Sequence, residues 1–317
     1  MATTVTVYKN TDTGAPTLTG TAGATGAINV LDKCLVTGYG AKAAAGWTKP
    51  YTGTDLAVFR GAAGNRFFLR VLENQSGYWD TYAIHLNGYE TMSDVNTGTG
   101  PFPATGVNAV NIVNSGAATR PWIVVADDRT VYAFFDHHGL MGYESFAFGD
   151  TFSYTASDGY RTILAGGATS GGTGDGLGKL KTSISSTSAR HYMARTYAGT
   201  GGSLLVGLHG DAAKQPTANL LSGILLYPNS SDSKIWLSPI YAHEIAEPTP
   251  RAKMRGFWHW LHALSGIADQ DTFPGAGALA GKTFLVIKDA SNANSGGGAG
   301  TLYGAFIIET SSTWDTN

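Results

Sequence analysis

The chain has 317 residues, of which 43 are glycine and only 14% are charged, against about 7% glycine and about 25% charged residues in an average soluble domain. Its formal net charge of −2, without a long run of like charge, excludes the electrostatic footprint of a protein that binds nucleic acid or an anionic membrane surface. Cys34 is the single cysteine, so an intrachain disulfide and a cysteine-based zinc site are excluded as well.

The N-terminal region predicts one strand and then one helix. Residues 3–8 alternate as in an edge strand. Residues 28–39 (INVLDKCLVTGY) predict a helix, because Ile28, Leu31 and Leu35 recur near helical spacing and a glycine follows as a stop. The first ten residues lack the charged and apolar regions of a signal peptide, and no apolar run approaches the ~20 residues of a membrane span. We therefore expect synthesis in the cytoplasm and no membrane partner.

Two β-hairpins follow. The first pairs residues 55–60 with 66–71, in which Phe67, Leu69 and Val71 share one face and Arg66, Phe68 and Arg70 the other. We expect one of these faces to be core and the other to meet solvent or a subunit. The second pairs residues 121–126 with 131–135, with a proline confined to the start of its first strand.

Between the hairpins, residues 96–119 are rich in Gly, Pro, Asn and Thr and show little periodicity, which predicts a loop. Residues 166–181 have the composition of a linker. Later apolar runs predict strands; they cover residues 204–209, 223–228, 233–241, 282–288 and 302–310.

These patterns predict a mainly β fold, in which turn-rich antiparallel sheets form a sandwich or a barrel-like arrangement with one or two short helices. The two glycine-rich stretches suggest three parts. We expect an N-terminal β-rich subdomain with one short helix (1–115), a central β-hairpin region (116–172) and a C-terminal β-rich subdomain (173–317).

One segment imitates a phosphate-binding loop. Residues 275–288 (GAGALAGKTFLVIK) contain Gly-Lys-Thr, but Ala276 stands where the motif requires its first glycine. A phosphate loop also leads into a helix, whereas Phe284 to Ile287 predict a strand. We therefore expect a glycine-rich turn and no nucleotide cofactor.

The histidines do not complete a zinc-protease motif. His243 and Glu244 would need a second histidine at position 247, which is Glu247. His259 and His262 would share a face only if their segment were helical, and the apolar residues between them favour burial in a packed interface. We expect no metal site here.

The acidic residues and the cysteine give no catalytic pattern. Many aspartates fall in turns, where such side chains usually bond their own backbone, although oxygen-rich loops can hold calcium; they are Asp127, Asp128, Asp150, Asp158, Asp175, Asp269 and Asp271. No Gly-x-Ser-x-Gly nucleophile motif occurs. The sequence therefore predicts that the protein is not an enzyme.

The aromatic residues remain as candidates for a binding or subunit surface, since tyrosine and tryptophan serve both sugar stacking and interface contacts. Those in turn-rich segments or in the aromatic segment 255–262 are Trp47, Tyr51, Tyr78, Trp79, Tyr82, Trp258 and Trp260. For more than half of them, packing in the core is the default interpretation.

Three separated pieces of the sequence are distinctive. They are GYGAKAAAGWTKPYTGTDLAVFR with NRFFLRV and GYETMSDVNTGTGPFP, RPWIVVADDRTVYAFF with FAFGD, and RGFWHWLHALSGIADQDTFPGAGALAGKTFLVIK with FIIETSSTWD. Together they resemble a family of structural proteins of tailed-bacteriophage and prophage virions. The resemblance implies a virion component made in the host bacterium and assembled in many copies, and it supplies no catalytic residues.

We therefore expect a structural component of the virion, in the tail or neck or associated with the capsid, that acts by homo-oligomeric assembly with copies of itself and with other virion proteins. The alternative is a carbohydrate- or receptor-binding β protein of the phage tail, with a host glycan as its partner. A hydrolase of envelope glycans is the third hypothesis. Burial of Trp47 and Trp79 in the core would count against the alternative.

Overall fold

A computed structural model of the chain describes residues 4–75, 82–113, 118–136, 143–166, 168–169, 191–209, 237–245, 249–260, 267–288, 305–311 and 313–314. These residues form two antiparallel sheets and one helical segment, and neither sheet closes into a barrel within the part that is described. The mainly β fold predicted from the sequence is confirmed. Among the described helices, none is both long enough and apolar enough to cross a membrane.

The predicted helix is present as α1 (Ala27–Asp32), which continues without a break into a π-helical turn, η1 (Lys33–Thr37). It ends at Gly38, whose φ of 74° suits a residue without a Cβ. The side chains of Val30, Leu31, Cys34 and Leu35 are fully buried. Burial raises the pKa of the Cys34 thiol, which therefore behaves as a small apolar side chain.

The smaller sheet contains seven strands in the order β13-β7-β5-β4-β3-β2, with β6 paired to β5. Their bounds are β2 (Thr48–Gly53), β3 (Leu56–Arg60), β4 (Phe68–Gln75), β5 (Tyr82–Met92), β6 (Gly98–Phe102), β7 (Asn108–Val113) and β13 (Ala168–Thr169). The first predicted hairpin is confirmed as β3 and β4. The predicted loop over residues 96–119 is wrong, because β6 and β7 lie there; their cross-strand bonds to β5 outweigh a composition rich in turn residues.

The larger sheet contains thirteen strands in the order β1-β8-β9-β10-β12-β14-β15-β16-β17-β20-β19-β18, with β11 paired to β17. Its first half consists of β1 (Thr6–Lys9), β8 (Trp122–Ala126), β9 (Thr130–Asp136), β10 (Tyr143–Asp150), β12 (Thr162–Gly166) and β14 (Tyr192–Met193). Its second half consists of β16 (Leu237–Glu244), β17 (Ala252–Trp260), β18 (Thr272–Pro274), β19 (Thr283–Lys288) and β20 (Ala305–Glu309), with β11 (Phe152–Ser153) at one end.

Strand β15 (Leu204–His209) joins the two halves of the larger sheet. Leu204 and Leu205 pair with β14, and the rest of the strand, from Val206 to His209, pairs with β16. The sheet turns at this strand, so that its second half packs against the outer face of its first half. The second predicted hairpin, β8 and β9, lies in the first half and is confirmed.

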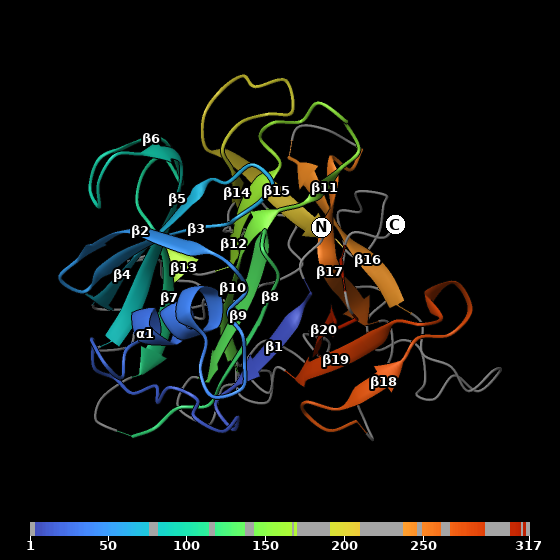
Figure 1. Ribbon diagram of the computed structural model, residues 1–317. Helices are drawn as coiled ribbons and strands as arrows, with labels where there is room; N and C mark the ends of the chain where they lie inside the picture. Colours follow the sequence, from blue (N-terminus) through green and yellow to red (C-terminus); the bar gives the residue numbers. More distant parts are fainter. Residues whose placement is uncertain are drawn as a thin grey trace, which may run out of the picture.

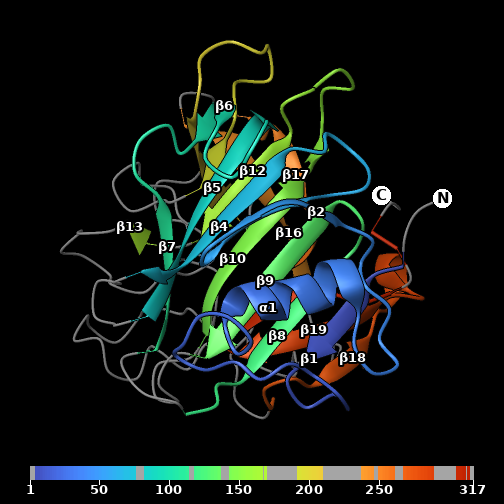
Figure 2. The same ribbon diagram turned by 60° about the vertical axis from the view of Figure 1, so that its left-hand side comes forward.

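The protein therefore has three β layers, which Figure 1 shows side by side, with the smaller sheet on the left and β16 to β20 on the right. One core lies between the smaller sheet, α1 and the first half of the larger sheet, and Figure 2 shows α1 lying across β8 and β9. A second core lies between the two halves of the larger sheet, and includes Tyr132, Phe134, Phe257 and Trp314. The predicted sandwich arrangement thus occurs twice.

The later predicted strands agree with the structure wherever they are described, at β15, β16, β19 and β20; residues 223–228 and most of the predicted linker lie outside the described residues. The segment around His259 is part of strand β17, so the helical arrangement considered for it does not occur. The three predicted subdomains stay a prediction. Hydrogen-bonded strands cross both of their boundaries, since β1 pairs with β8 and β12 pairs with β14.

Candidate functional site

Two of the seven predicted surface aromatics lie in the core. Trp47 is 3% exposed, and its Nε1–H donates to the carbonyl of Asp127 at 2.7 Å. Tyr82 is 1% exposed; its hydroxyl donates to Oε2 of Glu73 at 2.8 Å and accepts from the amide of Ala27 at 3.1 Å. Both side chains hold elements of the scaffold together and neither faces solvent.

Of the other predicted aromatics, the two whose side chains are described, Tyr51 and Trp258, lie on different sheets. Tyr51 stacks on Phe68 on the outer face of the smaller sheet, with ring centroids 6.5 Å apart. Trp258 packs edge-on against Phe284 on the outer face of the larger sheet. Trp260 ends strand β17, and nothing is described of its side chain; Tyr78 and Trp79 lie outside the described residues.

The segment that resembles a phosphate-binding loop and the histidines considered as metal ligands do not form the corresponding sites among the described residues. Residues 277–279 form a short 3-10 turn that leads into strand β19, so the Gly-Lys-Thr segment enters a strand as predicted. Burial lowers the pKa of His259, while His262 lies outside the described residues. Within the described part of the chain, no three His, Cys, Asp or Glu side chains gather as metal ligands would.

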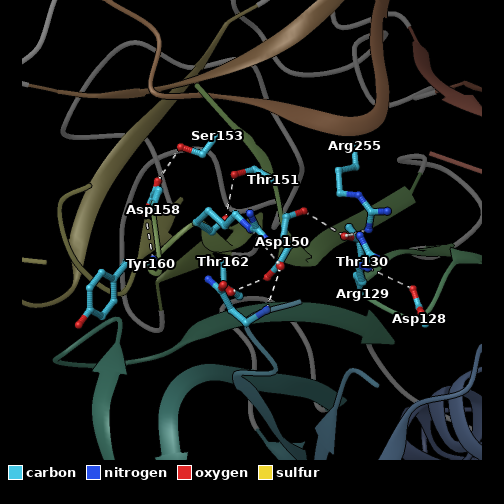
Figure 3. Close-up of polar contacts among 12 residues, drawn as sticks. Asp128, Arg129, Thr130, Asp150, Thr151, Ser153, Asp158, Tyr160, Thr162 and Arg255 are labelled. Carbon is cyan, nitrogen blue, oxygen red and sulfur yellow. Dashed lines mark hydrogen bonds and ion pairs between the residues drawn. The ribbon is translucent and has the colours of Figure 1, made fainter. Parts of the chain in front are cut away.

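Three of the aspartates predicted in turns, Asp127, Asp150 and Asp158, are the centres of a polar network at one end of the first half of the larger sheet (Figure 3). Asp150, at the end of β10, accepts from the amide of Asn65 at 3.0 Å and from the hydroxyl of Thr162 at 2.9 Å, and its Oδ2 lies 3.3 Å from Nε of Arg161. Its carbonyl accepts from the hydroxyl of Thr130 at 3.0 Å. Asp150 thereby fixes the turn between β3 and β4 of the smaller sheet to the larger sheet.

A second centre is the pair of Asp158 and Arg251. Nε and Nη2 of Arg251 donate to the two carboxylate oxygens of Asp158 at 2.9 and 2.8 Å, and the Arg251 side chain is only 3% exposed. Arg251 Nη1 also donates to the carbonyl of Arg195 at 2.6 Å and lies 3.0 Å from Oε1 of Glu244. The hydroxyl of Ser153 and the amide of Tyr160 complete the bonds to Asp158.

Arg251 thus fixes two loops at the same end of the molecule. One loop, residues 154–161, contains Tyr154, whose amide donates to the carbonyl of Arg251 at 3.0 Å. The other, residues 194–203, contains Tyr197, whose amide donates to Oε1 of Glu244 at 2.9 Å. The side chains of Tyr154 and Tyr197 are 60% and 51% exposed, which sets them apart from the other large apolar side chains described. Two exposed rings therefore lie on loops that are bonded at their bases to Arg251 and Glu244.

The third centre joins the two halves of the larger sheet. Nη2 of Arg255, from β17, lies 2.7 Å from Oδ2 of Asp127 in the β8–β9 turn, and both side chains are 2% exposed. The amides of Arg129 and Thr130 also donate to Asp127. Burial raises the pKa of the Asp127 carboxyl, although Arg255 and these amides oppose the effect. Loss of either side chain would therefore destabilise the fold, since the other charge would be buried without a partner.

No protein-family model matches the chain, and a search of curated proteins finds no significant match.

The sequence analysis missed Tyr154, Tyr197, Arg251 and Arg255. For the arginines a signal existed, because charged residues within the largely apolar segment 251–260 imply buried partners. The two tyrosines stand among ordinary turn residues, and their exposure depends on how far the loops project. No pattern along the chain could have distinguished them from tyrosines of the core.

Proposed function

We propose that the protein is a structural subunit of a tailed-bacteriophage particle, in the tail or neck, that acts by homo-oligomeric assembly with copies of itself and with other virion proteins. The resemblance of the three distinctive segments supports this role. The structural observation that supports it best is that buried carboxylates join distant parts of the chain. Asp127, Asp150 and Asp158 each join segments that are far apart in the chain.

Such contacts between distant segments favour a scaffold that keeps one conformation. A buried ion pair adds little net stability over an apolar pair, but it tolerates few alternative arrangements of the segments that it joins. Loops that are already ordered lose less conformational entropy on association. Tyr197, presented on one such loop, is the residue that we expect to contribute most to contacts between subunits, since tyrosine is enriched among interface hot spots.

Purified protein is expected to form a defined oligomer in size-exclusion chromatography with light scattering, and to be detected by mass spectrometry in purified phage particles. Tyr197→Ala is expected to shift the oligomer toward monomer while circular dichroism stays unchanged. Lys33→Ala, on the helical segment far from the loop, serves as the control and should leave the oligomer intact. A strictly monomeric protein that is absent from particles would refute the proposal.

The carbohydrate-binding alternative predicts that Trp47 and Trp79 face solvent. Trp47 lies in the core, which counts against it. A different group of side chains, described below, offers a surface for a saccharide.

A further inference from the structure

Strands β11, β17 and β16 lie next to one another at the upper right of Figure 1. Ala242, Ala252 and Met254 of β16 and β17 point into the second core, so the residues that alternate with them lie on the outer face of the larger sheet. Lys253 of β17 pairs in register with Phe152 of β11 on one side and with Tyr241 of β16 on the other. Residues opposite each other in antiparallel strands point to the same face. Phe152, Lys253 and Tyr241 therefore form a row, and the exposed Tyr154 follows Phe152 by two residues; together these four side chains form a strip.

The strip is open to solvent. Phe152, Lys253 and Tyr241 are each partly exposed, and Tyr154 is 60% exposed. Partial burial and the phenol of Tyr241 both raise the pKa of Tyr154. The Lys253 ammonium lies 5.4 Å from the centre of the Phe152 ring. The strip thus offers aromatic rings around one positive charge.

Lys253 lacks a carboxylate within salt-bridge distance among the described residues. Glu309, which acts on it electrostatically, is already bound by Lys282, whose Nζ lies 2.8 and 2.9 Å from its two oxygens. Burial, and secondarily Lys282, lower the pKa of Lys253. A partly buried ammonium without a counter-ion is less costly when an external anion binds beside it.

We propose that this strip binds an acidic saccharide, with the anionic group paired to Lys253 and a sugar ring stacked on Tyr154 and Tyr241. The size of the strip favours a saccharide over a protein. A specific protein interface uses about 20 to 30 residues on each side, whereas four side chains match one or two sugar rings. The positive charge of Lys253 favours a negatively charged sugar over a neutral one. The negative charge of the ligand can come from a carboxylate or from a phosphate group.

Binding is tested by isothermal titration calorimetry at low salt with three probes: tetragalacturonate, mannose 6-phosphate, and neutral galactotetraose. Saturable binding is expected for at least one of the two acidic probes, and the comparison between them identifies the anionic group. Galactotetraose is expected to bind at least tenfold more weakly. An absence of saturable binding by both acidic probes, or equal binding of galactotetraose, would overturn the proposal.

The variants locate the binding on the strip. Lys253→Gln is expected to weaken acidic-probe binding about tenfold or more, and Tyr154→Ala to weaken it similarly, whereas Tyr154→Phe keeps the ring and retains most of the binding. Lys33→Gln is the charge-matched control, and should bind as the unchanged protein does. Tyr154 is exposed, so its replacement tests the strip even if Lys253→Gln does not fold. Unchanged binding by Tyr154→Ala, or tighter binding of an Asp-rich hexapeptide than of either acidic saccharide, would refute a saccharide site.

Discussion

Arg255 and Asp127 join the two halves of the larger sheet through a buried ion pair with an Nη2–Oδ2 distance of 2.7 Å. Arg255 comes from β17 and Asp127 from the turn after β8, so the pair spans the core that those two layers enclose. The Arg255 guanidinium also lies 5.5 Å from the centre of the Phe152 ring and 5.8 Å from that of Trp314. Two aromatic rings thus lie beside the buried guanidinium.

Arg255→Met is expected to lower the free energy of unfolding by about 3 to 5 kcal/mol, because it leaves the Asp127 carboxylate buried without its cation. Urea denaturation followed by tryptophan fluorescence measures the change. The double variant Arg255→Met/Asp127→Leu is expected to recover part of the loss, since it removes both charges. A loss below about 1 kcal/mol in the single variant, typical of an exposed pair, would contradict this account.

Arg251→Lys is expected to loosen both tyrosine-bearing loops, because a lysine ammonium cannot bond Asp158 through two nitrogens and reach the Arg195 carbonyl as well. Limited digestion with chymotrypsin checks this, and should show faster cleavage after Tyr154 and Tyr197.

Arg60→Lys is a matched control in strand β3, where the guanidinium lies 4.6 Å from the centre of the Phe68 ring. It should leave the cleavage pattern at the two loops unchanged. Equal digestion of Arg251→Lys and the unchanged protein would show that Arg251 does not fix the loops.

Lys42→Ala is expected to promote aggregation through the edge of β1 that faces away from β8, beside which no further strand lies among the described residues. Lys42 Nζ donates to the Val7 carbonyl at 2.8 Å, and a carboxylate oxygen of Asp12 accepts from the Lys9 amide at 2.9 Å, so both side chains cover backbone groups that another strand could otherwise bond. Light scattering during mild heating measures the effect, with Lys33→Ala as the control. Identical scattering by the two variants would count against edge protection by Lys42.

Alkaline pH is expected to destabilise the protein through its buried tyrosines. Burial raises the pKa values of Tyr82, Tyr132 and Tyr143 above the ordinary value of 10.0. Below pH 10 these phenols are protonated in both states, so their contribution to stability is fully present. Above it the unfolded chain loses protons that the folded chain keeps, and stability falls as pH rises.

Denaturation at stepped pH, together with the ultraviolet absorbance of phenolate, checks this expectation. The absorbance of the buried tyrosines should rise only together with unfolding. Titration of all tyrosines near pH 10 in a protein that stays folded would contradict it.

Several local features could be predicted because they depend on neighbours in the chain. The spacing of Ile28, Leu31 and Leu35 located the helical segment, and the alternation in residues 66–71 located β4. It also placed Leu69 and Val71 on one face, which the structure shows to be the core face. The prediction of a loop over residues 96–119 was wrong because the structure there depends on pairing with another strand and not on neighbours in the chain. Its strands β6 and β7 are stabilised by bonds to β5, and their composition resembles that of a loop.

The sequence by itself determined the mainly β class, the two hairpins and the bonds of Asp127 and Asp158 to nearby backbone amides, because periodicity and turn chemistry act over a few residues. Only the tertiary structure decided that Trp47 and Tyr82 are buried, that Arg251 and Arg255 find carboxylates more than 90 residues away, and that Lys253 stands between Phe152 and Tyr241. The reason is physical: strand pairing and layer packing bring together residues from distant parts of the chain, and burial and charge pairing follow from that arrangement.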